Sequence, residues 1–240
     1  MSELPRIGLI VDEPRTLAGG RQSDPVSIVA LRSTLRNMPR ASGAKSLGER
    51  IRTTYPEAEL GVYAWHYVTH ARADGLAKQA SRKIPDKEFG HLRADAAGVQ
   101  SALTATRTVM EALESRLMFL RTPPSFSTGQ TSRDRLAEFC AKSAEDGIST
   151  VWSPEGIWTD EEALAVGRAS GAEVLLSVRV DRLGPELEDA WLRIDGELRG
   201  GAADRLCDAL DVFETLPTLM FSGPRAIPNM RSFARAWAEY

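Results

Sequence analysis

The stretch LMFLRTPPSF, residues 117–126, is an apolar run that enters a turn stiffened by two prolines. A helical pattern follows over residues 133–144, and a second apolar run, ISTVW at 148–152, enters another proline turn, SPEGIW at 153–158. This order predicts a strand, a helix and a second strand that runs parallel to the first, because a helical crossover joins them. Both polar turns should therefore emerge at one rim of a sheet.

Outward from this unit, short apolar runs alternate with helical patterns along the chain. We expect further strands at residues 6–12, 26–35, 59–65, 173–178, 190–194 and 219–221, and further helices at 46–55, 92–114, 159–170, 202–214 and 228–238. About eight strands in 240 residues favour one α/β domain over residues 1–240, a closed (β/α)8 barrel of the TIM type. The connection at residues 13–25 is too short for a proper helix, so we expect it to be irregular.

Local chemistry marks one helix start and one helix end. Thr159 and Glu162 have the spacing of a capping box, in which each side chain bonds the other residue's backbone amide. Gly171 suits the left-handed position that ends a helix. No Gly-x-Gly-x-x-Gly segment follows the first strand and no phosphate-cradling Gly-Lys-Ser/Thr loop is present, which argues against the main nucleotide-binding folds.

Composition points to a soluble protein of the cytoplasm. The chain is 42% hydrophobic and carries 30 basic against 33 acidic residues, so its net charge of -3 gives no overall attraction to nucleic acid or an anionic membrane. Cys140 and Cys207 lie in helical patterns and are expected to be buried thiols of a reducing compartment. We expect no signal peptide at the N-terminus and no membrane span, since no apolar run approaches the ~20 residues that a span needs.

The turns of this chain resemble those of a known family. Residues 119–126 (FLRTPPSF), Trp65 with Thr69 and His70, and residues 154–158 are similar to turns of the YecE-like barrels, the family called domain of unknown function 72. Residues 32–34 (RST), residues 191–196 (WLRIDG) and Asn229 fall in matching order, so the resemblance covers most of the chain. It implies a TIM-type barrel and no established reaction.

Departures from the family pattern gather at the mouth of the implied barrel. Where such barrels carry acids, a lysine, an arginine and a histidine, this chain has Ala30, Tyr63, Ser153, Glu155, Ser177 and Asp195. Losing a general acid or base normally removes ~10²–10⁴-fold in rate. The resemblance therefore implies a mouth that has lost its ancestral chemistry.

Two histidines are candidate metal ligands. His66 and His70 have the i, i+4 spacing that places two zinc ligands on one face of a helix. They cross an expected strand-to-loop junction, where the backbone should not be helical, and no ligand pattern lies nearby. We expect no metal and no cofactor. His70 is a candidate anion-facing group, with a structural role as the alternative, and His91 is expected to face solvent.

The remaining candidates lie at expected strand ends. Asp12, Glu155 and Asp195 sit at the rim where TIM-barrel enzymes keep catalysis, and two carboxylates about 5–9 Å apart can hydrolyse glycosides. The alternative is that these acids cap helices or pair with arginine. Basic side chains near the same strand ends would suit an anionic ligand. The alternative is that these basic side chains form a solvated face. The expected ligand-contacting residues are Arg32, Thr34, Trp65, His66, Arg121, Ser125 and Trp158.

Two functions from different classes follow. The leading hypothesis is a non-catalytic binding or scaffold component of a protein complex, with a protein partner or a second copy of the chain and an anionic small molecule as ligand. The alternative is a hydrolase or lyase for a phosphorylated or sugar-like substrate, with Glu155 and Asp195 as acid and base and His70 and Arg121 positioning an anion. Nucleic-acid binding through the basic residues 72–87 ranks last, because the net charge is negative.

Overall fold

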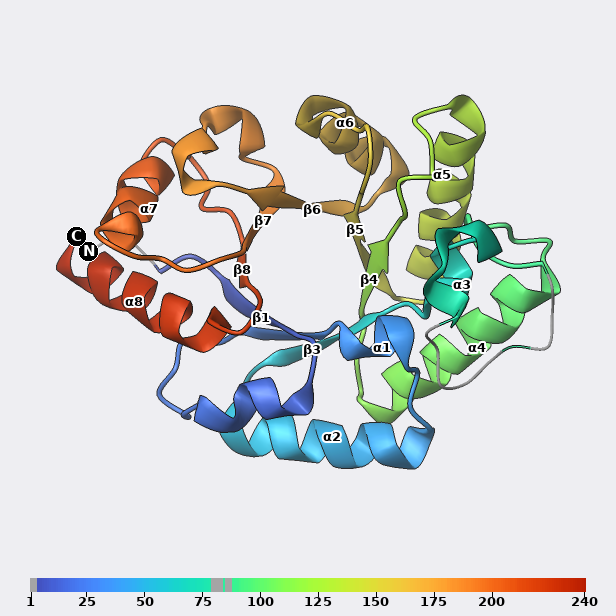
Figure 1. Ribbon diagram of the computed structural model, residues 1–240, viewed down its shortest axis with the longest axis horizontal. Helices are drawn as coiled ribbons and strands as arrows, with labels where there is room; N and C mark the ends of the chain where they lie inside the picture. Colours follow the sequence, from blue (N-terminus) through green and yellow to red (C-terminus); the bar gives the residue numbers. More distant parts are fainter. Residues whose placement is uncertain (1–3, 79–83, 85–87) are drawn as a thin grey trace.

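The computed structural model describes residues 4–78, 84 and 88–240. Its parallel strands close into a barrel in sequence order, each strand paired with the next and the last with the first (Figure 1). The strands are β1 (Ile7–Val11), β2 (Ile28–Leu31), β3 (Glu59–Tyr63), β4 (Leu117–Arg121), β5 (Ser149–Ser153), β6 (Glu173–Val178), β7 (Ala190–Ile194) and β8 (Leu219–Phe221). The predicted (β/α)8 barrel is confirmed.

Helices form a layer around the outside of the barrel, and the last helix lies against β1 (Figure 1). The α-helices are α1 (Ser33–Arg36), α2 (Ala41–Thr54), α3 (His66–Thr69), α4 (Ala97–Ala112), α5 (Gln130–Glu145), α6 (Asp160–Ser170), α7 (Ala202–Leu210) and α8 (Ala226–Glu239). The 3₁₀ segments are η1 (Pro14–Gly19), η2 (Arg72–Asp74), η3 (Leu76–Lys78), η4 (Val180–Arg182) and η5 (Pro185–Leu187). The expected irregular connection after β1 contains η1.

Alternate residues of each strand fill the barrel interior, because successive side chains of a strand point to opposite faces. The Tyr63 and Phe119 rings stack there with centroids 5.0 Å apart, and Trp191 meets Phe119 edge-on at 5.9 Å. Gly61 is required beside them, since a Cβ at that position would lie 2.4 Å from the Phe119 ring. This inner cluster comprises Ile10, Ile28, Ala30, Leu35, Tyr63, Leu117, Phe119, Val151, Leu175, Trp191 and Met220.

The opposite faces of the strands pack against the helices and form a larger core. Leu9, Val62, Trp152 and Phe221 belong to it, each at most 1% exposed. Both cysteine thiols are free and buried, as the helical patterns around them predict. No helix in the described part of the chain is long and apolar enough to cross a membrane.

The structure corrects the expected course of two segments. The second strand ends at Leu31 and residues 33–36 form α1, where the Thr34 hydroxyl lies 2.7 Å from both the Leu31 and Tyr63 carbonyl oxygens. Residues 66–69 were expected to be non-helical and instead form α3. Backbone amides of residues 90–92 donate to carbonyls of residues 67–69, and these long-range bonds support that turn.

Helix α6 begins with the predicted capping box. Thr159 Oγ1 accepts from the Glu162 amide at 3.1 Å, and Glu162 Oε2 accepts from the Thr159 amide at 3.3 Å. The helix ends at Ser170, and the next residue, Gly171, has the left-handed φ of 70°. Thr159→Ala should lower the free energy of unfolding by about 1 kcal/mol in urea denaturation, since it removes one cap. Thr159→Ser keeps the oxygen, so an equal loss in both variants would contradict this assignment.

Candidate functional site

Three arginine–carboxylate pairs surround the C-terminal end of the barrel, called the mouth below. Arg32 follows β2, Arg121 ends β4 and Arg193 lies in β7; they are called the mouth arginines. Their side chains are 19%, 27% and 17% exposed, so each is only partly hydrated. TIM-barrel enzymes build their active sites at this end, which makes the mouth the first place to look for function.

The pair between Arg32 and Asp12 is bidentate. Arg32 Nε donates to Asp12 Oδ1 at 2.7 Å and Nη2 donates to Oδ2 at 2.6 Å. The hydrogen bond from Arg32, together with its charge, lowers the pKa of Asp12, so this carboxylate is a weaker base than usual. A pocket of about 490 Å³ opens beside the pair, lined by Asp12, Glu13, Arg32, Ser33, Leu35, Arg36, Asn37 and Arg121.

The two acids proposed for catalysis are both engaged. Glu155 accepts a hydrogen bond from Arg121 Nε at 2.8 Å. Asp195 accepts from Arg193 Nε at 2.8 Å and from Ser177 at 3.0 Å, and it also accepts from Ser222. Burial acts to raise the pKa of Asp195, but the bond from Ser222 and the charge of Arg193 outweigh it and lower the pKa.

Tyr63 ends β3, and its side chain lies in the barrel interior. Its side chain is fully buried, and its hydroxyl has no hydrogen-bond partner among the described groups. Burial raises the pKa of Tyr63 to about 12, while the charges of Arg32, Arg193 and Arg121 oppose that rise. The phenol therefore stays protonated at neutral pH and remains a hydrogen-bond donor.

The two candidate histidines are buried beneath the rim. His66 is fully buried, with Nδ1 2.8 Å from the Leu35 carbonyl oxygen, and burial lowers its pKa. His70 is 3% exposed and contacts the Thr69 hydroxyl at 2.8 Å. Burial lowers the pKa of His70 to about 4, so this side chain is neutral near pH 7. A neutral imidazole attracts an anion less strongly than a protonated one would, which weakens the prediction of His70 as an anion-facing group.

Two other predicted ligand contacts lie inside packed structure. Trp65 is 2% exposed and its ring meets the Tyr67 ring edge-on at 4.9 Å. Trp158 is partly buried, and its indole nitrogen donates to the Phe126 carbonyl at 3.1 Å. The Arg133 guanidinium lies 5.5 Å from the Trp158 ring centroid. Both side chains have packing roles, and so does Thr34, whose hydroxyl bonds to backbone carbonyls.

Ser125 belongs to a cluster that the sequence did not predict. The Ser125 hydroxyl lies 2.7 Å from Asp74 Oδ1 and 2.9 Å from His91 Nε2. The hydroxyl has one proton, which it donates to Asp74, so His91 donates to the hydroxyl oxygen. A nucleophilic serine would instead donate to histidine, with the carboxylate on the other ring nitrogen. His91 was expected to face solvent, but its side chain is only 28% exposed.

The backbone around His91 is unusual. Gly90, His91 and Leu92 have φ angles of 89°, 54° and 54°, and non-glycine residues rarely adopt positive values. The amides of these residues donate to the carbonyls of Tyr67, Thr69 and Val68, which holds the strained segment against α3. The loop therefore fixes His91 against the turn that follows β4.

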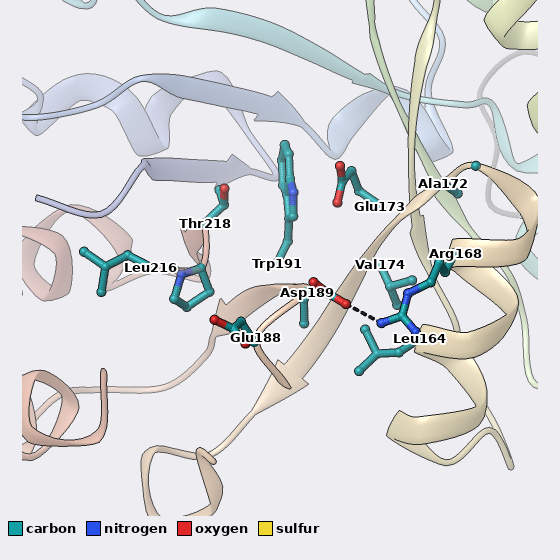
Figure 2. A pocket seen from close by; sticks show the side chains of 13 residues that line it. Leu164, Arg168, Ala172, Glu173, Val174, Glu188, Asp189, Trp191, Leu216 and Thr218 are labelled. Atoms are coloured by element: carbon teal, nitrogen blue, oxygen red, sulfur yellow. Dashed lines mark hydrogen bonds and ion pairs between the residues drawn. The ribbon is translucent and has the colours of Figure 1, made fainter. Parts of the chain in front are cut away.

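A second hollow, of about 500 Å³, lies at the opposite end of the barrel (Figure 2). It is bounded by the beginnings of β6, β7 and β8, with Glu173, Trp191 and Thr218 among its side chains. Arg168 and Asp189 form an ion pair across its wall. TIM-barrel enzymes carry their active sites at the other end of the barrel, so the mouth remains the candidate site.

The described residues contain no group of three His, Cys, Asp or Glu side chains placed to hold a metal ion. Within the basic segment weighed for nucleic acid, Arg82, Lys83 and Lys87 lie outside the described residues.

No family model and no curated protein matches the chain. Solved structures do share its fold. A DUF72 family protein from Enterococcus faecalis V583 has a TM-score of 0.59 at 9% identity, covering 98% of this chain and 96% of that one. A family 2 AP endonuclease from Brucella melitensis has a TM-score of 0.61 at 12% identity, covering 97% and 99%.

A third similar structure is a xylose isomerase domain containing protein from Salmonella typhimurium LT2. Its TM-score is 0.55 at 11% identity, with 100% of this chain and 98% of that chain covered. Such low identities show a shared TIM-barrel fold and carry no reaction from one chain to another. The fold that the YecE-like resemblance implied is therefore present.

Proposed function

We propose that this protein is a divergent YecE-like barrel that binds a small anion at its mouth and does not transform it. The observation that carries the proposal is the set of three partly buried mouth arginines, with the buried Tyr63 at the end of β3, the strand between β2 and β4. Arginine suits carboxylates and phosphates because its planar fork makes two parallel hydrogen bonds. The adjoining pocket, about 490 Å³, has the size of a small-molecule site.

Paired carboxylates support the non-catalytic part of this proposal. A general base needs a free lone pair and a pKa near the working pH. Asp12 and Asp195 have lowered pKa values, and Glu155 is bound to Arg121. His70, the other candidate, is buried and contacts Thr69. Turnover of phosphorylated or sugar-like substrates that Glu155→Gln abolishes would establish the enzyme alternative instead.

Two mouth variants should change anion affinity in opposite directions. Arg32→Gln removes a charged donor and should weaken binding of glucose 6-phosphate by about tenfold to a hundredfold, since bonds to charged groups contribute about 1.5–3 kcal/mol. Asp12→Asn releases Arg32 from its partner and should strengthen binding. Isothermal titration calorimetry at two salt concentrations measures both effects, and added salt should weaken binding through screening.

Arg168→Gln provides the matched control, because it breaks an exposed arginine–aspartate pair at the other end of the barrel. It should leave affinity unchanged. Wild-type protein that binds no anion, or equal affinity in Arg32→Gln and wild type, would refute anion binding at the mouth.

We also propose that the chain is a component of a protein complex. The pairing of the rim acids with arginines supports this, because a barrel without catalysis can still serve through a surface that binds another protein or a second copy. Light scattering of the purified chain measures whether a second copy associates. Pull-down from the source cell tests for a different protein partner. A lone monomer in both experiments would refute a scaffold role and leave the small-anion proposal to stand alone.

A further inference from the structure

The Tyr63 hydroxyl is a buried donor whose partner the described residues do not provide. Leaving such a group unpaired costs about 1–3 kcal/mol, and native structures contain few of them. The ring itself cannot turn away easily, because it stacks on Phe119 with an interplanar angle of 15°. Tyr63 ends β3, which lies between the strand that Arg32 follows and the strand that Arg121 ends, so a ligand oxygen bound among these residues would give the fixed, protonated hydroxyl its acceptor.

The mouth arginines approach from separate parts of the ring of strands. They belong to or follow β2, β4 and β7, no two of which are neighbours in the barrel, while Tyr63 ends β3. A planar carboxylate presents two oxygens and one charge. A phosphate monoester presents three terminal oxygens at tetrahedral angles and a charge of about -1.5 to -2 at pH 7. The tetrahedral group suits donors carried by several separate strands.

We propose that the mouth takes a phosphate monoester, with the Tyr63 hydroxyl donating to one terminal oxygen and Arg32, Arg121 and Arg193 facing the others. This inference rests on the proposed anion-binding function and names its ligand class. On binding, the mouth arginines exchange bonds to Asp12, Glu155 and Asp195 for bonds to phosphate oxygens. The organic part of the ester occupies the pocket lined by Ser33, Arg36 and Asn37.

Calorimetry with two probes of similar size tests the ligand class. Glucose 6-phosphate carries a phosphate monoester where glucuronate carries a carboxylate. The wild-type protein should bind the phosphate ester more tightly. Tyr63→Phe should weaken glucose 6-phosphate by about tenfold or more, as expected for the loss of a hydrogen bond to a charged group, and should reduce the preference over glucuronate.

The thermal midpoint without ligand separates this effect from misfolding. Tyr63→Phe removes an unpaired hydroxyl and keeps the stacked ring, so its midpoint should equal or exceed that of the wild type. Tyr55→Phe, which removes a buried hydroxyl at the end of α2, is the control and should keep wild-type affinity.

The outcomes distinguish the two proposals. Unchanged phosphate affinity in Tyr63→Phe, with weak binding in Arg32→Gln, would overturn the role of Tyr63 and leave anion binding intact. Tighter binding of glucuronate than of glucose 6-phosphate would overturn the phosphate class alone. A wild-type protein that binds neither probe would overturn anion binding itself, and this inference with it.

Discussion

Replacing Phe119 with alanine should lower the free energy of unfolding by about 3–5 kcal/mol, the range for removing a large buried ring. Phe119 is fully buried in the barrel interior, stacked on Tyr63 and in edge contact with Trp191. Gly61 supplies no side chain on the neighbouring strand that would fill the space. The cavity should therefore persist, and urea denaturation with an unchanged m-value would report its full effect.

Phe139→Ala is the matched control, because Phe139 of α5 packs against the core and is only partly buried. The same substitution there should cause a clearly smaller loss. Phe119→Ala should also weaken phosphate-ester binding, since the Tyr63 ring loses the surface that orients its hydroxyl. Equal losses of stability in the two variants would show that the barrel interior collapses around the missing ring.

Local chemistry explains why much of the fold could be predicted. The apolar runs at 117–120 and 148–152 became β4 and β5, and the pattern at 133–144 became the central part of α5. Capping at Thr159 and the left-handed Gly171 depend only on neighbours in sequence. Where the order of strands and helices is regular, the parallel ring follows from the handedness of the crossovers.

Segments held by distant partners could not be predicted in the same way. The turn α3 is supported by amides of residues 90–92, more than twenty positions along the chain. Likewise α1 is held through the Thr34 hydroxyl at the Tyr63 carbonyl. The local sequence of either segment contains no pattern that reflects these long-range bonds. For this reason neither short helix was predicted.

The candidate site shows the same division. Arg32, Arg121, Glu155 and Asp195 were predicted at the rim because they follow apolar runs, and the structure brings each into an ion pair there. Arg193 was quoted only as part of a family turn. The alternation of Trp191 and Arg193 along β7, continued by Asp195 just after the strand, was the signal that could have identified it. The unpaired hydroxyl of Tyr63 depends on the whole interior and left no sequence signal.

Wild-type stability should fall as the pH drops from about 6.5 towards 4, and His70 should be a major cause. Burial is the largest influence on this side chain and lowers its pKa to about 4; Asp74 opposes the shift, while Arg121, His66 and His91 add to it. Between these pH values the unfolded chain binds a proton that the folded protein excludes. The stability that comes from keeping His70 neutral is therefore fully present above the pKa that His70 has in the unfolded chain. It is lost as the pH falls towards the pKa that His70 has in the folded protein, an effect on the order of 3 kcal/mol.

His70→Gln removes the titrating group, so the stability difference between wild type and variant should shrink as the pH falls through this window. Urea denaturation at a series of pH values measures that difference directly. His91→Gln is the control: the pKa of His91 is also lowered by burial, but its side chain is 28% exposed, so its difference should change less with pH. The difference in unfolding free energy between wild type and His70→Gln could instead stay constant from pH 7.5 to 4. That result would mean that His70 becomes protonated without disturbing the fold, and that the space around it admits water or a counter-ion.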